Sequence, residues 1–286
     1  MHGLNRPLVR PSPPVAERRP RFSVHHGVEL VDEYAWLRAA NWQEVMRDPG
    51  ALDPAIRAYL EAENAYTQAV LEDTTALQAE LFAEMKGRIK EDDSRVPEPD
   101  GRFAYFSSHV AGGQYPRLNR HPREGGPEEV LLDGNKEAEG KTYWQLGAYA
   151  HSPDHRFLAY AVDDKGSELY TVRIRDLATG LDLPEVVTDT RGALVWAQDS
   201  RTLFYVRLDD RHRPLLVYRH LAGTPAEEDT LVYEEPDSGF YVGVEQSQHL
   251  GFAFRERCEQ QDAIRDALRS GKPYRAGGTA RRLQLE

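Results

Sequence analysis

Apolar residues recur every three or four positions in two stretches of the N-terminal third, which predicts two amphipathic helices. The first stretch follows Asp53, a good N-cap residue, and Pro54, which suits the first helical position. The second runs from residue 74 to residue 89, and its apolar positions are Leu77, Leu81, Phe82 and Met85. Because two helices alone make a poor core, we expect both apolar stripes to pack against another part of a larger protein.

Residues 1 to about 50 lack this periodicity. Helix formation is opposed by Pro11, Pro13, Pro14 and Pro20, which favour extended structure. The start of the chain also lacks the apolar core of a secretory signal, and no run approaches the ~20 apolar residues of a membrane span. We therefore expect a mobile leader on a cytoplasmic protein.

From Pro97 onward the pattern changes to short alternating runs of the kind that form strands, and these runs repeat. Three pairs of equivalent residues lie 45 positions apart, namely Asp154 and Asp199, Tyr160 and Tyr205, and Val187 and Val232. Each unit is predicted to contain four strands, the last of which is EVV in one unit and LVY in the next. A looser copy begins at Asp100, and a further copy opens at Phe240.

Four strands repeated every ~40–50 residues are typical of a β-propeller blade. We predict a mainly β fold, with an extended and helical segment over residues 1–92 and an incomplete propeller over residues 93–254. The propeller part supplies about three blades and the start of a fourth. Since a propeller usually closes with about four to eight blades, the chain looks like part of one.

The last 32 residues, 255–286, differ from the rest of the chain. They hold eight Lys and Arg against five Asp and Glu, whereas the whole chain has 36 and 47. The alternating pattern also ends near Phe254, where a fourth blade needs its next strand. An unstructured polar tail and a break in the reading frame between Gln248 and Phe254 both account for this change, and we favour the break.

Composition limits the classes of partner and compartment. The formal charge of −11 argues against nucleic acid or an anionic membrane surface as the main partner. The single cysteine, Cys258, excludes an internal disulfide and a zinc ribbon and indicates a reducing compartment.

Known catalytic and binding motifs are absent from the sequence. It contains no G-x-S-x-G nucleophile turn and no phosphate-binding glycine loop. The glycine pairs at 112–113 and 125–126 are interpreted as turns, the acidic run 91–93 as a solvated surface, and Cys258 as unreactive. We therefore assign no catalytic, cofactor-binding or metal-binding residue and expect no cofactor.

The ten histidines form no metal-binding pattern. His151 and His155 are four residues apart, but Pro153 between them forbids a helix, so we interpret them as turn residues rather than ligands. His25 and His26 are adjacent, and their side chains would point apart on a strand.

Several longer strings resemble one family of peptidases. They include VDEYAWLR at residues 31–38, YLEAENAY at 59–66, RIKEDDSRVPEPDGRFAYFS at 88–107 and LVWAQDSRTLFYVR at 194–207. These strings resemble the oligopeptidase B branch of the prolyl oligopeptidase family, almost continuously from residue 13 to about 248. The WLR at 36–38 favours that branch.

The resemblance implies a seven-bladed propeller joined to an α/β-hydrolase domain that carries the catalytic Ser, Asp and His. It also implies that the N-terminal segment packs on the hydrolase domain and that peptides are cleaved after Arg or Lys. The expected partners are thus basic peptides and the hydrolase domain. This chain is expected to lack that domain and to be inactive alone. The alternative is a stand-alone propeller-type binding module without catalysis.

Overall fold

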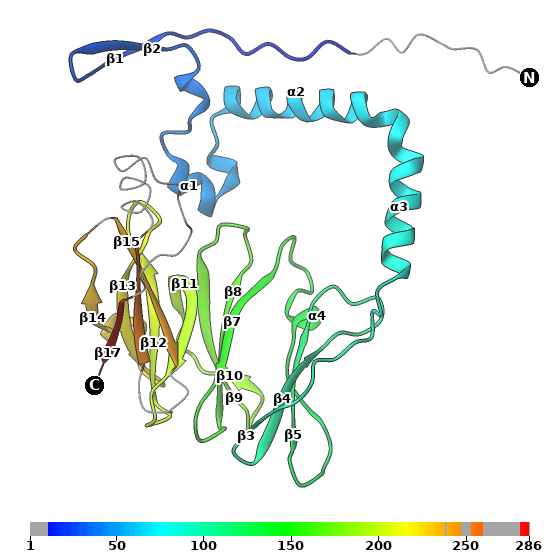
Figure 1. Cartoon of the computed structure of the whole chain (residues 1–286), viewed down its shortest axis with the longest axis vertical. Helices are drawn as coiled ribbons and strands as arrows, with labels where there is room; N and C mark the ends of the chain where they lie inside the picture. Colours follow the sequence, from blue (N-terminus) through cyan, green and yellow to red (C-terminus); the bar gives the residue numbers. More distant parts are fainter. Residues whose placement is uncertain (1–10, 238, 247–252, 260–280, 286) are drawn as a thin grey trace, which may run out of the picture. The chain divides into compact units, whose positions relative to one another are not determined.

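The computed structural model describes residues 11–237, 239–246, 253–259 and 281–285 (Figure 1). The chain divides into two compact units, Met1–Glu91 and Asp92–Glu286. Antiparallel pairing joins the neighbouring strands of every sheet, so the prediction of a mainly β fold is confirmed.

The first unit opens with a hairpin of β1 (Arg21–His25) and β2 (Val28–Asp32). His26 and Gly27 form its turn, and both have a positive φ, 52° and 78°. Two consecutive residues with positive φ match the right-handed twist of a tight hairpin. His25 is thus the last residue of a strand, whereas His26 lies in the turn. Two 3-10 turns, Ala35–Leu37 and Pro49–Ala51, flank α1 (Trp42–Arg47).

The two predicted helices are confirmed as α2 (Pro54–Leu71) and α3 (Thr75–Gly87), joined by a 3-10 turn at Glu72–Thr74. Asp53 caps α2, since its side chain accepts hydrogen bonds from the backbone N–H groups of Ala55 and Ile56. The apolar residues of α3 are largely exposed, with Phe82 at 64% and Met85 at 59%.

The second unit begins with a four-stranded sheet of β3 (Glu98–Asp100), β4 (Phe103–Ser108), β5 (Arg117–Pro122) and β6 (Glu129–Asp133). The strands pair in chain order, as in a meander, and the short helix α4 (Gly134–Glu137) follows. This sheet is the looser copy predicted from Asp100 onward.

An eight-stranded sheet follows. Its strands are β7 (Gln145–His151), β8 (Phe157–Asp163), β9 (Tyr170–Asp176), β10 (Leu181–Asp182), β11 (Val187–Trp196), β12 (Thr202–Leu208), β13 (Pro214–Leu221) and β14 (Thr230–Glu234). A 3-10 turn, Ala226–Glu228, precedes β14.

The sequence predicted that the fourth strand of one unit and the first strand of the next are separate, and here the structure differs. β11 is one strand whose start pairs with β9 and whose end pairs with β12. Its pairing shifts register around residues 190–194, where Gly192 has a φ of 94°. This irregularity bends the strand, so that one strand serves both units.

The last sheet contains β15 (Phe240–Gln246), β16 (Ala253–Glu259) and β17 (Arg281–Leu285). The pattern predicted no further strand after Phe254, but β16 extends to Glu259, and β17 pairs with β16. The side chains of both strands, including that of Cys258, lie outside the described part of the chain.

We call residues 98–144, 145–186, 187–239 and 240–259 repeats 1 to 4. Apolar clusters fill the spaces between consecutive repeats. Strand β8 contributes to two of them, because Leu158 and Tyr160 face repeat 1 whereas Ala159 and Ala161 face repeat 3. Since β8 is covered on both faces, its apolar residues form a nearly continuous run.

Polar networks also join the repeats. Tyr160 donates a hydrogen bond to Asp182 (2.6 Å), and Arg175 binds both Asp182 (2.8 Å) and Glu137 of repeat 1 (2.9 Å). In repeat 3, Tyr205 donates to Asp229 (2.7 Å), which also binds Nδ1 of His220 (2.7 Å). His220 lies 45 positions after Arg175, so the two networks are equivalent.

Candidate functional site

A cavity of about 430 Å³ lies in the second unit, where repeats 1 and 2 meet. Strands β3 and β4 contribute Glu98, Asp100 and Tyr105, and strand β7 contributes Tyr149 and His151. Gln198 of repeat 3 and Gln246 of repeat 4 also line it. The cavity thus gathers side chains from all four repeats.

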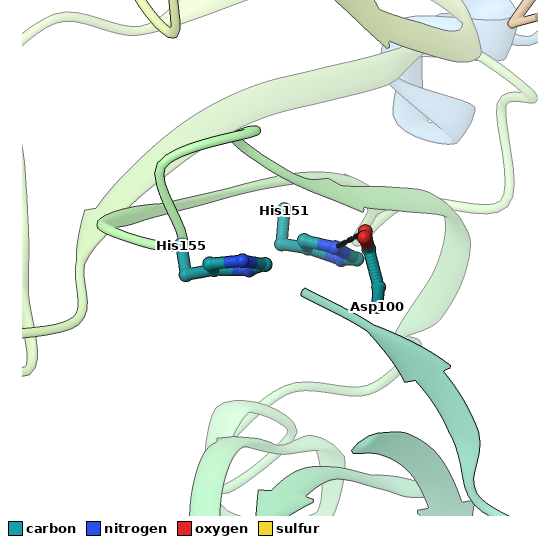
Figure 2. A group of neighbouring side chains, drawn as sticks. All are labelled: Asp100, His151 and His155. Atoms are coloured by element: carbon teal, nitrogen blue, oxygen red, sulfur yellow. Dashed lines mark hydrogen bonds and ion pairs between the residues drawn. The ribbon is translucent and has the colours of Figure 1, made fainter. Parts of the chain in front are cut away.

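Asp100, Tyr105 and His151 line this cavity. Asp100 and His151 also lie close to His155 (Figure 2). Nε2 of His151 lies 2.7 Å from Oδ2 of Asp100, and the hydroxyl of Tyr105 lies 2.9 Å from Nδ1 of His155. The Tyr105 ring also stacks on the His151 ring, with centroids 3.8 Å apart and planes within 8°. The cluster therefore joins β3 and β4 of repeat 1 to β7 and the following turn of repeat 2.

Two tight turns place these side chains. Asp100 ends β3, and Gly101 follows with a φ of 52°. His155 has a φ of 64° in the turn after β7, which is closed by a hydrogen bond from the Ser152 hydroxyl to Asp154 (2.6 Å). A Cβ atom at Gly101 would lie 2.4 Å from Nε2 of His155, so only glycine fits beneath that ring.

Burial changes the proton affinity of two members of the cluster. Burial lowers the pKa of His155, and the neighbouring His151 lowers it further, because two adjacent imidazolium charges repel. Burial likewise raises the pKa of Tyr105. At neutral pH the site therefore contains a neutral His155 imidazole and a neutral Tyr105 phenol.

The cluster occupies positions that also join repeats elsewhere in the fold. The positions 45 residues after His151 and His155 are Trp196 and Ser200. Trp196 donates its indole N–H to the Ala150 carbonyl (2.9 Å), and the Ser200 hydroxyl accepts from the Asp154 N–H (3.0 Å). Repeat 2 thus carries two histidines where repeat 3 carries an indole and a hydroxyl.

The sequence interpretation of these histidines is partly confirmed. His155 does lie in a turn, but His151 is the last residue of β7, and its side chain pairs with Asp100 (2.7 Å). Sequence reasoning missed Asp100 and Tyr105, which lie about 50 residues upstream in another sheet. The sequence carried no signal for this meeting, because the contacts of the equivalent positions, Trp196 and Ser200, are seen only in the structure.

The other candidates lie elsewhere. His25 and His26 belong to the first unit. Gly112 and Gly125 have positive φ, as expected for turns. Asp92 and Asp93 are exposed, which agrees with a solvated surface.

Comparison with known proteins identifies the class of domain. Residues 13–255 match the family model described as the N-terminal β-propeller domain of prolyl oligopeptidase. The chain therefore belongs to the prolyl oligopeptidase family, and the resemblance of its sequence strings is confirmed.

Individual relatives refine the comparison. The chain is 40% identical over 259 residues to dipeptidyl aminopeptidase BI of Pseudoxanthomonas mexicana, covering 83% of this chain and 34% of that protein. It is 30% identical over 249 residues to Protease 2 of Moraxella lacunata, with 84% and 34% covered. The chain thus spans about a third of the length of these relatives.

Solved structures of oligopeptidase B share the fold. The enzyme from Leishmania major superposes with a TM-score of 0.78 at 27% identity, over 86% of this chain and 36% of that one. The enzyme from Trypanosoma brucei, with covalently bound antipain, gives a TM-score of 0.75 at 28% identity, over 96% and 40%. No helix in the described residues is long and apolar enough to cross a membrane.

Proposed function

We propose that this chain is the N-terminal propeller portion of an oligopeptidase B-like serine endopeptidase, which cleaves short peptides after Arg or Lys. The match of residues 13–255 to the N-terminal propeller domain of the family carries the proposal. The TM-score of 0.78 to oligopeptidase B from Leishmania major supports the choice of branch.

In this proposal the chain supplies about three blades and the start of a fourth of a seven-bladed propeller. The catalytic Ser, Asp and His belong to an α/β-hydrolase domain encoded beyond these residues. There the serine attacks the peptide carbonyl, histidine takes the proton, and hydrogen-bond donors stabilise the oxyanion. The propeller limits access to short peptides, and the protein acts in the cytoplasm.

The exposed helices of the first unit agree with the presence of a separate hydrolase domain in the complete protein. Phe82, Met85 and Ile89 are each at least 59% exposed within the chain. Since apolar residues of this size are normally covered, we assign α2 and α3 to a contact with the hydrolase domain.

A second candidate is a dipeptidyl aminopeptidase, because the relative of that name is 40% identical to this chain. Such an enzyme would need a free amino terminus two residues before the cleaved bond, whereas an endopeptidase would not. The stand-alone binding module is not favoured, because the matching family model describes a domain of a peptidase.

The test begins with the 286-residue chain and a fluorogenic dipeptide substrate that ends in Arg. We expect no turnover above that of a mock purification. Clear turnover would contradict the proposal that the catalytic residues lie in a hydrolase domain outside these residues. The nucleotide sequence after codon 240 is then read in all three frames. A frame that resumes the blade pattern and encodes G-x-S-x-G with downstream Asp and His supports the proposal, and the lack of such a frame overturns it.

The complete protein then separates the two candidate activities. Two substrates with the same Arg-containing dipeptide are compared, one with a free and one with a blocked amino terminus. Hydrolysis of the blocked substrate supports the endopeptidase. Hydrolysis of the free substrate alone supports the dipeptidyl aminopeptidase.

A further inference from the structure

We propose that His155 makes the contact between repeat 1 and repeat 2 sensitive to acid, because a proton added to its imidazole weakens the packing of β3 and β4 against the turn that follows β7. His155 lies in that turn, close to the end of β3 (Figure 2). Its Nδ1 is 2.9 Å from the Tyr105 hydroxyl, and its Nε2 lies next to Gly101. A change in the charge of this ring therefore acts directly on the contact between the two repeats.

The imidazole of His155 lies among other rings. Phe103 meets it edge-on with centroids 5.4 Å apart, and the Tyr105 ring lies 6.0 Å away within 24° of parallel. The His151 ring is 5.7 Å away and within 19° of parallel. These rings replace water around His155, and removal from water disfavours the charged form of an imidazole more than the neutral form.

Most of the charged and titratable groups that face His155 also oppose a further positive charge. Arg102 follows Gly101 in the turn after β3, and Arg120 of β5 donates a hydrogen bond to the His155 carbonyl (2.7 Å). His151 of β7 acts in the same direction, since two adjacent imidazolium charges repel.

The anions around the ring have other partners. Asp100 of β3 favours the charged form of His155, but it is paired with Nε2 of His151 (2.7 Å). Glu129 of β6 is paired with Arg120 (2.7 Å). In the turn that carries His155, Asp154 accepts from the Ser152 hydroxyl (2.6 Å).

The cation that follows in the same turn is paired as well. Arg156 binds Asp176 of repeat 2 at 3.0 Å. The groups in contact with His155 thus leave an added proton on its ring without a free carboxylate partner among the residues named.

The direction of the pH effect follows from these surroundings. Burial, and then the neighbouring His151, lower the pKa of His155. The neutral imidazole therefore stabilises the fold above the unfolded-state pKa of about 6.5, and this stabilisation is lost as pH falls through the lower folded-state pKa. The contact between repeats 1 and 2 is thus strongest at neutral pH and weaker in mild acid.

The next contact along the fold provides a comparison. There the equivalent positions are Trp196 and Ser200, which contact the Ala150 carbonyl and the Asp154 N–H. Neither an indole nor a hydroxyl gains a proton between about pH 5 and 8. We therefore expect acid sensitivity from His155 and none from these two positions.

The test measures urea unfolding of the full 286-residue chain at about pH 7.5 and about pH 5.5, on either side of the ordinary histidine pKa. The variant is His155→Asn, because asparagine tolerates the positive φ of residue 155 and places an amide atom where Nδ1 stands, but takes no proton. In acid the midpoint of the parent should fall by roughly 0.3 M more than that of the variant. The control His109→Asn, at an exposed histidine of the same unit, should behave like the parent.

A second measurement reports the proton itself. The imidazole NMR signal that is missing from His155→Asn should titrate at a lower pH in the folded parent chain than in the urea-unfolded chain. Titration at the same pH in both states, or an equal acid loss in the parent and His155→Asn, would overturn the proposal.

Arg102→Gln tests the same idea with His155 in place, so the proposal stays testable where His155→Asn does not fold. This substitution removes an exposed cation that opposes the proton on His155. We expect the acid loss of the urea midpoint to become smaller than in the parent. An acid loss equal to or larger than that of the parent would contradict the proposal.

Discussion

Replacing Arg175 with methionine removes the cation that joins repeat 2 to repeat 1. Its guanidinium binds Asp182 at 2.8 Å and Glu137 at 2.9 Å, and it also contacts the Tyr160 hydroxyl at 3.1 Å. Burial opposes the charge of Arg175, but the hydrogen bonds that it donates to the two carboxylates outweigh this effect and raise the pKa of the arginine. Methionine keeps most of the side-chain volume, so the substitution tests charge rather than packing.

The expected loss follows from the burial of the pair. Only 14% of the Arg175 side chain is exposed, against 24% for Asp182 and 28% for Glu137. Removing one partner of a buried ion pair costs about 3–5 kcal/mol, and this partial exposure places the loss near the lower figure. With a urea dependence of about 2 kcal/mol per molar, a loss of about 3 kcal/mol lowers the midpoint by roughly 1.5 M.

Arg156→Met provides the matched control. Arg156 also pairs with an aspartate of repeat 2, Asp176, at 3.0 Å, but its side chain is 60% exposed. An exposed pair contributes about 0.2–1 kcal/mol, so this variant should unfold close to the parent chain. Urea unfolding of the three proteins is followed by circular dichroism. Equal losses for the two variants would refute the argument that burial makes the Arg175 network important.

The remaining predictions concern single positions in the second unit. Tyr160→Phe and Tyr205→Phe should each lower the unfolding free energy by about 1.5–3 kcal/mol, because each removes a hydrogen bond to a carboxylate; a neutral result for either in urea unfolding would contradict the equivalence of the networks. Gly147→Ala should cost about 1–3 kcal/mol, since its Cβ would lie 2.3 Å from a tyrosine ring. Gly243→Ala, which meets no atom within 4 Å, should melt near the parent temperature; equal melting of the two variants would refute the clash. The backbone N–H of Ala178 donates a hydrogen bond to Asp176 and lowers the pKa of that carboxyl group. The ionised Asp176 therefore stabilises the fold above the unfolded-state pKa of about 4, and this stabilisation is lost as pH falls through the lower folded-state pKa. Asp176→Asn should therefore flatten the acid limb of melting temperature against pH, and an unchanged limb would argue against this role.

Local features of the fold were predictable from sequence because local interactions decide them. Asp53 and Pro54 start α2 where the pattern predicted, since a cap and a fixed φ act within one turn. The 45-residue offset identified Tyr160 and Tyr205 as equivalent, and the structure gives both the same hydrogen bond to an aspartate. Strand ends were less predictable, because the continuity of β11 depends on a register shift between two partner strands.

The sequence by itself determined the mainly β fold, the repeat and, through its longer strings, the family. It did not reveal the cluster of Asp100, Tyr105, His151 and His155, because periodicity describes one element at a time. Only the packing of repeat 1 against repeat 2 brings a carboxylate to an imidazole 51 residues away. The physical reason is that a strand's pattern specifies which face is buried, whereas the identity of its neighbour depends on how whole sheets stack.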